Sequence, residues 1–250
     1  MRVQQQQAFV LHTRSYSETS LLLEVFTPQY GRVGLIAKGA RRPQSRLRAV
    51  LAPFQPLLIG WSGRGELMIL TGAEPDGVEY GLQGEVLYCG FYLNELLTRL
   101  LHRYDPHEQL YNAYRETLEL LVQGGGRFEA ALRLFEKRLL RELGYGLMLE
   151  HDAADRSPIA AEALYEYVPE RGPIRIRHPE LHTRTEGVRV LGGSLLALAS
   201  DDLSDPRTLR EAKLLMRTLL APHLGERPLH SRHLFRQLVQ GRGTEQGGAA

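Results

Sequence analysis

Short runs of apolar residues, separated by turn residues, fill the first 80 positions of the chain. Five runs are rich in aliphatic and β-branched side chains, and they begin at Ala8, Leu21, Arg32, Pro56 and Glu66. Clusters of Gly, Pro and Ser punctuate them, and one longer connection, ARRPQSRLRAVLAPF, separates the third run from the fourth. This pattern is typical of strands in an antiparallel sheet. Five strands with one long connection predict a small closed barrel.

The period of the apolar residues changes after Tyr80 to the three- and four-residue spacing of helices. Asp205 and Pro206 provide a favoured cap and first position for the last predicted helix. The four predicted helices cover about Glu85 to His102, Glu108 to Val122, Phe128 to Leu143 and Pro206 to Leu220.

These patterns predict an α+β chain with two domains and a tail. An N-terminal five-stranded barrel of the OB-fold type over residues 1–80 would precede a mainly α-helical domain over residues 81–240. The signals between about 147 and 200 are weak, so an irregular segment is expected there, apart from a hairpin that would turn at Glu170 to Pro173. Residues 241–250, GRGTEQGGAA, have nothing to bury and are expected to be disordered.

Composition adds few constraints on function. The chain is 43% hydrophobic and 24% charged, as expected for a folded protein. Its one cysteine, Cys89, lies in an apolar segment and is expected to be buried, with no disulfide and no paired-cysteine zinc site. No signal peptide and no apolar run of about 18 residues is visible, so a cytoplasmic protein without a membrane partner is expected.

The distribution of charge is more informative than the net charge of +2. No acidic residue occurs between Glu24 and Glu66. Long cationic side chains along a groove suit phosphate contacts, although a solvated loop with ordinary counterions is the alternative. The predicted DNA-binding residues are Arg32, Lys38, Arg41, Arg42, Arg46, Arg48 and Arg64 from this interval, together with Arg14.

Four aromatic residues of the same domain could stack on bases or belong to its core, and the sequence does not separate the two roles. They are Tyr16, Tyr30, Phe54 and Trp61.

A cationic ridge is predicted on the third helix, where Arg133, Lys137 and Arg141 follow one another at four-residue spacing beside Arg138. The ridge could be a solvated face paired with Glu129, Glu136 and Glu142. Alternatively, it could bind an acidic peptide with an apolar end. Spacing alone favours the solvated face.

Signatures of catalysis and of cofactor binding were not found. GRVGLIAKGA lacks the Ser or Thr that follows the lysine of a phosphate-binding loop, and Gly124 to Gly126 joins two helices without a preceding strand. The pairs His178 with His182 and His230 with His233 lack further ligands nearby. We therefore expect no catalytic residue, no cofactor and no metal site, although carboxylates distant in sequence could still converge.

Several segments together resemble the RecO family of bacterial recombination mediators. The resemblance covers most of the chain and is most specific in AFVLHTRSYSETSLLLEVFTPQYGRVGLIAKGARRPQSRLRAVLAPFQPLL. LYCGFYLNELLTRLL, FEKRLLRELGYG and PLHSRHLFRQL contribute to it. The order of barrel, helical bundle and C-terminal segment also agrees.

The resemblance implies a protein that binds single- and double-stranded DNA, anneals complementary strands and works with RecR, without catalysis. It also implies contact with the acidic C-terminal tail of single-stranded DNA-binding protein (SSB), which favours loading of the RecA recombinase. The basic positions that match the family's tail site are Arg133 and Arg210, so the resemblance favours a functional ridge. Many family members carry four cysteines as a zinc site after GYG, whereas LMLEHDAADRSPIAAEALYEYV has none, so this region must be held by packing.

The leading hypothesis is thus a non-enzymatic DNA-repair mediator. In it, Arg133, Lys137, Arg141 and Arg210 bind the tail of the protein that coats single strands. Two alternatives remain: an OB-fold scaffold that binds protein alone, and a small hydrolase whose catalytic residues converge in three dimensions.

Overall fold

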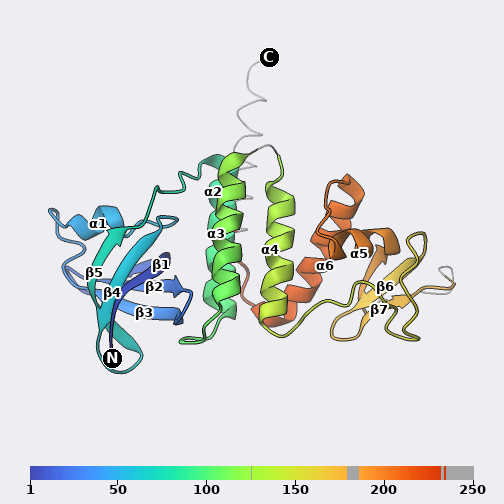
Figure 1. Cartoon of the computed structure of the whole chain (residues 1–250), viewed down its shortest axis with the longest axis horizontal. Coiled ribbons are helices and arrows are strands. Elements are labelled where there is room, and N and C mark those ends of the chain that lie inside the picture. The colour runs from blue at the N-terminus through green and yellow to red at the C-terminus, as the bar shows by residue number, and fades with distance from the viewer. Residues whose placement is uncertain (125, 179–185, 232–233, 235–250) are drawn as a thin grey trace, which may run out of the picture. The chain divides into compact units, whose positions relative to one another are not determined.

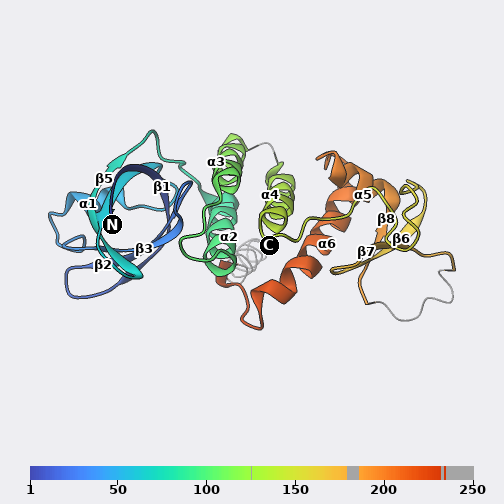
Figure 2. The same cartoon turned by 60° about the horizontal axis from the view of Figure 1, so that its bottom comes forward.

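In the computed structural model, five strands at the start of the chain close into a barrel (Figures 1 and 2). Their order around the barrel is β1-β2-β3-β5-β4, and β3 and β5 pair in parallel while the other neighbours are antiparallel. The predicted N-terminal OB-fold barrel is confirmed. The strands are β1 Arg2–Ser15, β2 Leu21–Thr27, β3 Gly31–Ala37, β4 Leu57–Ser62 and β5 Leu67–Pro75.

The first strand is longer than its apolar pattern indicated. β1 begins at Arg2 rather than at Ala8, because its first half pairs with β4 and its second half pairs with β2. Register shifts lie between Val3 and Gln6 and between Val10 and His12. Backbone hydrogen bonds hold the glutamine-rich start of β1 in the barrel, so this part of the strand needs no apolar alternation.

The barrel core is formed by the inward residues of all five strands. Trp61 is fully buried there, and Ala40 and Leu51, from the connection after β3, also belong to this core. Leu51 directly follows α1 (Arg46–Val50), a short helix within the connection that the sequence pattern left as a loop.

Two long helices pack on the outside of the barrel, α2 (Gly84–Leu100) against β1 and α3 (Glu108–Gln123) against β2. Phe9 and Phe26, which are paired across β1 and β2, contact the ring of Tyr114. The Tyr114 hydroxyl donates to Asn94 Oδ1 at 2.6 Å, and Asn94 Nδ2 donates to the carbonyl of Leu11 at 3.1 Å. This buried chain of hydrogen bonds joins α3, α2 and β1, so the helices cover part of the outer face of the barrel.

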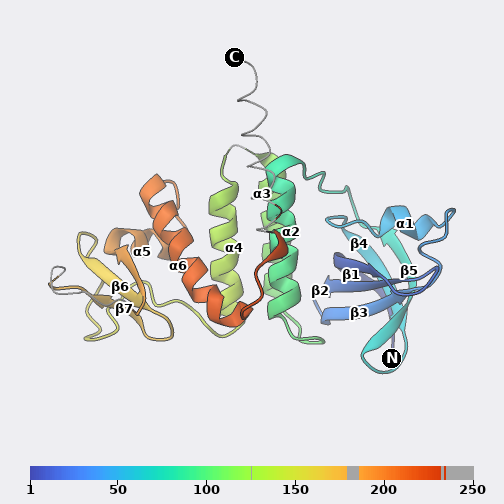
Figure 3. The same cartoon turned by 180° about the vertical axis from the view of Figure 1, so that it is seen from behind.

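A segment from late in the chain returns to α2, as Figure 3 shows. Glu95 accepts hydrogen bonds from the backbone of His230 and Ser231 and from the Ser231 hydroxyl. Arg99 pairs with Glu95 and donates to the carbonyls of Arg227 and Pro228. We call this set of contacts the Glu95 clasp.

The contacts of the chain form two compact units, residues 1–125 with 226–250 and residues 126–225. The first unit groups α2 and α3 with the barrel, whereas the sequence pattern predicted a domain boundary near residue 80. The predicted domain limits therefore stay a prediction. The structure describes residues 1–124, 126–178, 186–231 and 234. The predicted disordered tail over 241–250 lies outside these residues.

The described residues of the second unit form three helices and a three-stranded antiparallel sheet of order β7-β6-β8. The predicted hairpin is confirmed, since β6 pairs with β7 across the turn at residues 169–171. The rest of the segment from 147 to 200 has more regular structure than its weak signals indicated. The elements are α4 Phe128–Glu142, β6 Leu164–Val168, β7 Gly172–Arg175, β8 Val188–Leu191, α5 Gly192–Ala199 and α6 Pro206–Leu224.

A buried carboxylate fixes the loop that follows the GYG segment. Asp152 is 2% exposed, and its two oxygens accept from the backbone N–H groups of Ala154 at 2.7 Å and Arg175 at 3.0 Å. Leu149 and Ile159 are buried in the same stretch. Hydrogen bonds and packing therefore hold the region in which the sequence lacks cysteines.

Candidate nucleic-acid interface

Two loops of the barrel meet beyond the end of β3. The backbone N–H of Arg41 donates to the carbonyl of Thr19 at 2.9 Å, and its guanidinium donates to the carbonyl of Ser17 at 2.7 Å. Arg41 thereby joins the β1–β2 turn to the connection that follows β3. Figure 1 shows α1 at this end of the barrel and the N-terminus at the other.

Six exposed cations gather on and beside these loops, and we call them the cationic cluster. Among the residues that the structure describes, none of the six forms an ion pair. Glu18 is the one carboxylate in the two loops, and the side of the connection at Lys38, Arg42 and Ser45 is hollowed. The cationic cluster consists of Arg14, Lys38, Arg41, Arg42, Arg46 and Arg48.

The other two predicted DNA-binding residues lie elsewhere. Arg32 is near the start of β3, where its guanidinium donates to the carbonyl of Thr98 at 2.7 Å and lies 3.7 Å from Glu24. Burial lowers the pKa of Arg32, and the charge of Glu24 opposes this change. Arg64 is exposed on the β4–β5 turn, which contacts Tyr104 rather than the loops of the cationic cluster. Arg32 is therefore a structural residue of the first unit.

The structure separates the aromatic residues into core and surface. Trp61 is fully buried, Phe54 is 3% exposed, and Tyr30 packs on Trp61 with ring centroids 5.2 Å apart. Tyr16, in contrast, is 54% exposed in the β1–β2 turn. Of the four candidates, Tyr16 is the one that is exposed, whereas Tyr30 is partly buried against the core.

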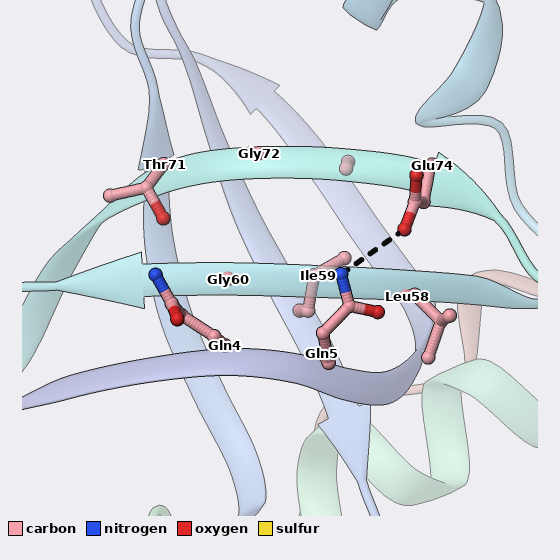
Figure 4. A pocket seen from close by; sticks show the side chains of 9 residues that line it. Gln4, Gln5, Leu58, Ile59, Gly60, Thr71, Gly72 and Glu74 are labelled. Carbon is pink, nitrogen blue, oxygen red and sulfur yellow. Dashed lines mark hydrogen bonds between the residues drawn. The ribbon is translucent and has the colours of Figure 1, made fainter.

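A second hollow of the barrel lies between β1, β4 and β5 (Figure 4). Gly60 and Gly72 form part of its floor, and Gln5 donates to Glu74 at one side. Its lining contains a carboxylate and no cation, so this hollow does not suit a phosphate backbone.

The predicted ridge on α4 is only partly accessible. Arg133 is 6% exposed and pairs with Glu136 at 2.7 Å. Lys137 donates to the carbonyls of Leu198 and Ala199 at the end of α5, and it also pairs with Asp201. Both side chains are thus bound within the fold.

Arg141 and Arg210, the remaining tail-site candidates, are exposed on α4 and α6. Near Arg141 is a hollow of about 250 Å³ with apolar walls that include Leu140, Met148 and Leu219. The stem of Arg141 lies beside Gly146, which also lines this hollow. We call it the GYG pocket, because residues 144–146 form part of its wall.

Metal and membrane signals are absent from the described part of the chain. No group of three or more metal-ligating side chains comes together there. His182 and His233, one member of each histidine pair, lie outside the described residues. The helices that can be described are too short or too polar to cross a bilayer.

Sequence reasoning missed two apolar residues near the cationic cluster. Ile36 and Ile69 are paired across β3 and β5, and their strand neighbours Leu35 and Met68 point into the core. Ile69 is 37% exposed on the outer face. The signal in the sequence was weak, because Ile36 directly follows the core residue Leu35 and breaks the alternation of the third strand at this one position.

Comparisons with known proteins agree along almost the whole chain. The family model described as "Recombination protein O N terminal" matches residues 1–77, and "Recombination protein O C terminal" matches residues 82–233. A DNA repair protein RecO from Nitrosococcus oceani is 52% identical over 238 residues, which are 95% of each chain. A DNA repair protein RecO from Dechloromonas aromatica is 49% identical over 241 residues, 96% of this chain and 98% of the relative. With its OB-fold barrel and helical region, the chain belongs to the RecO family of DNA repair proteins.

Proposed function

We propose that this protein is a recombination mediator that binds single- and double-stranded DNA and anneals complementary strands. It acts without catalysis and, together with RecR, helps load RecA onto DNA that is coated with SSB. The cationic cluster is the observation that carries this proposal. Six cations without a carboxylate partner among the described residues favour phosphates, whose negative charges they would neutralise.

Binding through phosphates also suits annealing. Contacts to the backbone carry no sequence information, so two complementary strands of any sequence can bind alike. Neutralising their charges reduces the repulsion between them.

The second part of the proposal concerns the acidic tail of SSB. Arg141 and Arg210 are the tail-site candidates with exposed side chains, and the GYG pocket offers apolar walls to the end of the tail. A cation beside an apolar hollow complements an acidic peptide with an apolar terminus. Arg133 and Lys137 would act indirectly, by holding α4 in place.

A charge-reversal variant tests the DNA-binding site. Lys38, Arg42 and Arg46 are changed to Glu together, while Arg41 is retained because it fastens the β1–β2 turn. We expect weaker binding to all DNA sequences alike, and a slope of log affinity against log salt that is smaller by roughly 2 for single strands. The measurement is a fluorescence titration at several salt concentrations.

The matched control changes the same net charge at three exposed arginines outside the cationic cluster, Arg2, Arg115 and Arg217. Equal losses in both triple variants would mean that net charge, not this site, governs binding. Unchanged affinity in the first variant would refute the site. A wild-type protein without any salt-dependent DNA binding would favour the protein-binding scaffold, and turnover of labelled DNA with Mg²⁺, Mn²⁺ or Zn²⁺ would favour a hydrolase.

A further inference from the structure

A row of outward residues crosses the barrel next to the cationic cluster. Arg14 on β1 is paired with Leu22 on β2, Leu22 with Ile36 on β3, and Ile36 with Ile69 on β5. The neighbouring row, which includes Leu23, Leu35 and Met68, points into the core. Because successive side chains of a strand point to opposite faces, the first row lies on the outside.

The same side of the sheet continues into the two loops. Tyr16 follows Arg14 by two residues, and its backbone N–H donates to the carbonyl of Ser20 at 3.1 Å, which extends the β1–β2 ladder. Lys38 follows Ile36 by two residues. Alternation therefore assigns Tyr16 and Lys38 to the outer face on which Arg14 and Ile36 lie.

Exposed apolar side chains and cations thus lie on the same face of the barrel. Tyr16 is 54% exposed and Ile69 is 37% exposed, whereas Leu22 is buried between them. Such a surface complements a ligand that carries both flat apolar faces and negative charges. Unpaired bases on a phosphate backbone have this combination, but a duplex hides its base faces in the stack and presents mainly phosphates.

We propose that Tyr16, on the same outer face of the barrel as Ile36 and Ile69, is a platform on which the bases of single-stranded DNA stack, and that this platform gives the protein a preference for single strands. The inference rests on the proposed DNA binding by the cationic cluster. The cations supply affinity for any DNA, whereas the platform contributes only when bases are unpaired.

Three oligonucleotide probes of equal length separate base contacts from phosphate contacts. They are single-stranded oligo(dT), an abasic strand with the same phosphates but no bases, and a blunt duplex. Tyr16→Ala is expected to weaken oligo(dT) binding about tenfold, as one lost base stack would. The same variant should bind the abasic strand and the duplex as the wild type does.

Matched variants control for folding and for general loss of an exposed apolar side chain. Tyr16→Phe keeps the ring and should retain the affinity for oligo(dT). Leu214→Ala removes another exposed apolar side chain, 51% exposed in the second unit, and should leave binding of all three probes unchanged. Unchanged oligo(dT) binding by Tyr16→Ala, or an equal loss on all three probes, would overturn the platform.

A fluorescent reporter gives an independent readout. Trp61, the one tryptophan of the chain, is fully buried, so the added indole of Tyr16→Trp reports on the loop. Stacking on oligo(dT) should quench this added emission, and the abasic strand should not. Quenching of equal size by both probes would contradict base stacking. A wild type that binds none of the probes would instead refute the proposed function itself.

Discussion

Arg32 and Arg133 are both paired with carboxylates inside the fold. Arg32 was predicted to bind DNA from the charge pattern, and Arg133 was predicted to bind the SSB tail from the family resemblance. Arg32 lies beside Glu24, which also pairs with Arg103, and Arg133 lies beside Glu136. Lys38 and Arg42, in contrast, are exposed on a loop. The type of residue predicts its charge, but the neighbours decide whether that charge is available to phosphate or peptide.

Arg133→Ala is expected to destabilise the protein by about 3 kcal/mol, because Glu136 would lose the guanidinium that pairs with it in a buried site. The free energy of unfolding, measured by urea denaturation, checks this value. Arg141→Ala, at an exposed position of the same helix, should change it by less than about 0.5 kcal/mol.

A double variant shows whether the loss belongs to the pair. Arg133→Ala combined with Glu136→Ala should lower the free energy of unfolding by less than the sum of the two single changes. The reason is that each single variant leaves one buried charge unpaired, whereas the double variant has neither charge. Additive losses would show that the two side chains do not act together.

Helix α2 joins three parts of the first unit. Its Asn94 donates to β1 and accepts from α3, and its Glu95 and Arg99 hold the segment that contains Arg227 to Ser231. Periodicity predicted this helix within two residues at each end. The polar positions that make these contacts were not recognised, because their partners are distant in sequence.

The Glu95 clasp should make stability depend on pH. Burial of the carboxylate raises its pKa, but hydrogen bonds from Ser231 and His230 and the charge of Arg99 outweigh burial and lower the pKa below 4.5. A group with a lowered pKa in the folded state stabilises the protein above its ordinary pKa, and this contribution is lost as the pH falls through the folded-state pKa. Wild type should therefore be more stable than Glu95→Gln at pH 7, and this advantage should disappear in acid.

Thermal unfolding of both proteins between about pH 3 and pH 7 measures the effect. Glu79→Gln, at an exposed glutamate of the same unit, is the control and should follow the wild type over this range. A difference between wild type and Glu95→Gln that stays constant with pH would contradict the role of the carboxylate charge.

The strands and helices of the second unit differ in how well their sequences predict them. Asp205 accepts from the backbone N–H of Thr208 at 2.7 Å, so the start of α6 follows from local chemistry. Its end does not, because the helix continues to Leu224 past Pro222, which cannot donate to the preceding turn. Helix α5 begins with Gly192 and Gly193, which are poor helix formers, and it was not predicted.

Two separate units offer surfaces for two ligands. The cationic cluster and Tyr16 lie in the first unit. The GYG pocket lies in the second unit, which also contains Arg141 beside the pocket and Arg210 on α6. If each surface binds its own ligand, a change in one unit should leave the other activity intact.

We expect Arg141→Ala and Arg210→Ala each to weaken binding of an acidic peptide ending in Phe by about fivefold, since an exposed charge contact contributes up to about 1 kcal/mol. Their affinity for DNA should remain that of the wild type. The charge reversal of Lys38, Arg42 and Arg46 should weaken DNA binding and leave the affinity for the peptide unchanged. Fluorescence anisotropy measures the affinity for each ligand.

Arg217→Ala, at an exposed arginine of α6, is the control and should retain peptide binding. Wild-type peptide affinity in both Arg141→Ala and Arg210→Ala would refute the tail site. A loss of DNA binding in these variants would show that the two surfaces are not independent.

Apolar periodicity was sufficient to predict the five barrel strands, the four long helices and the α+β order, because burial of one face repeats every two or every 3.6 residues. The acid-free interval between Glu24 and Glu66 was likewise visible without a structure. Only the tertiary structure showed that Arg32 lies apart from the cationic cluster. It also showed that Trp61 is buried and that Tyr16 is exposed. Local spacing fixes which residues share a strand or helix, whereas exposure and pairing depend on contacts between residues far apart in the chain, such as Arg41 with Thr19 and Glu95 with Ser231.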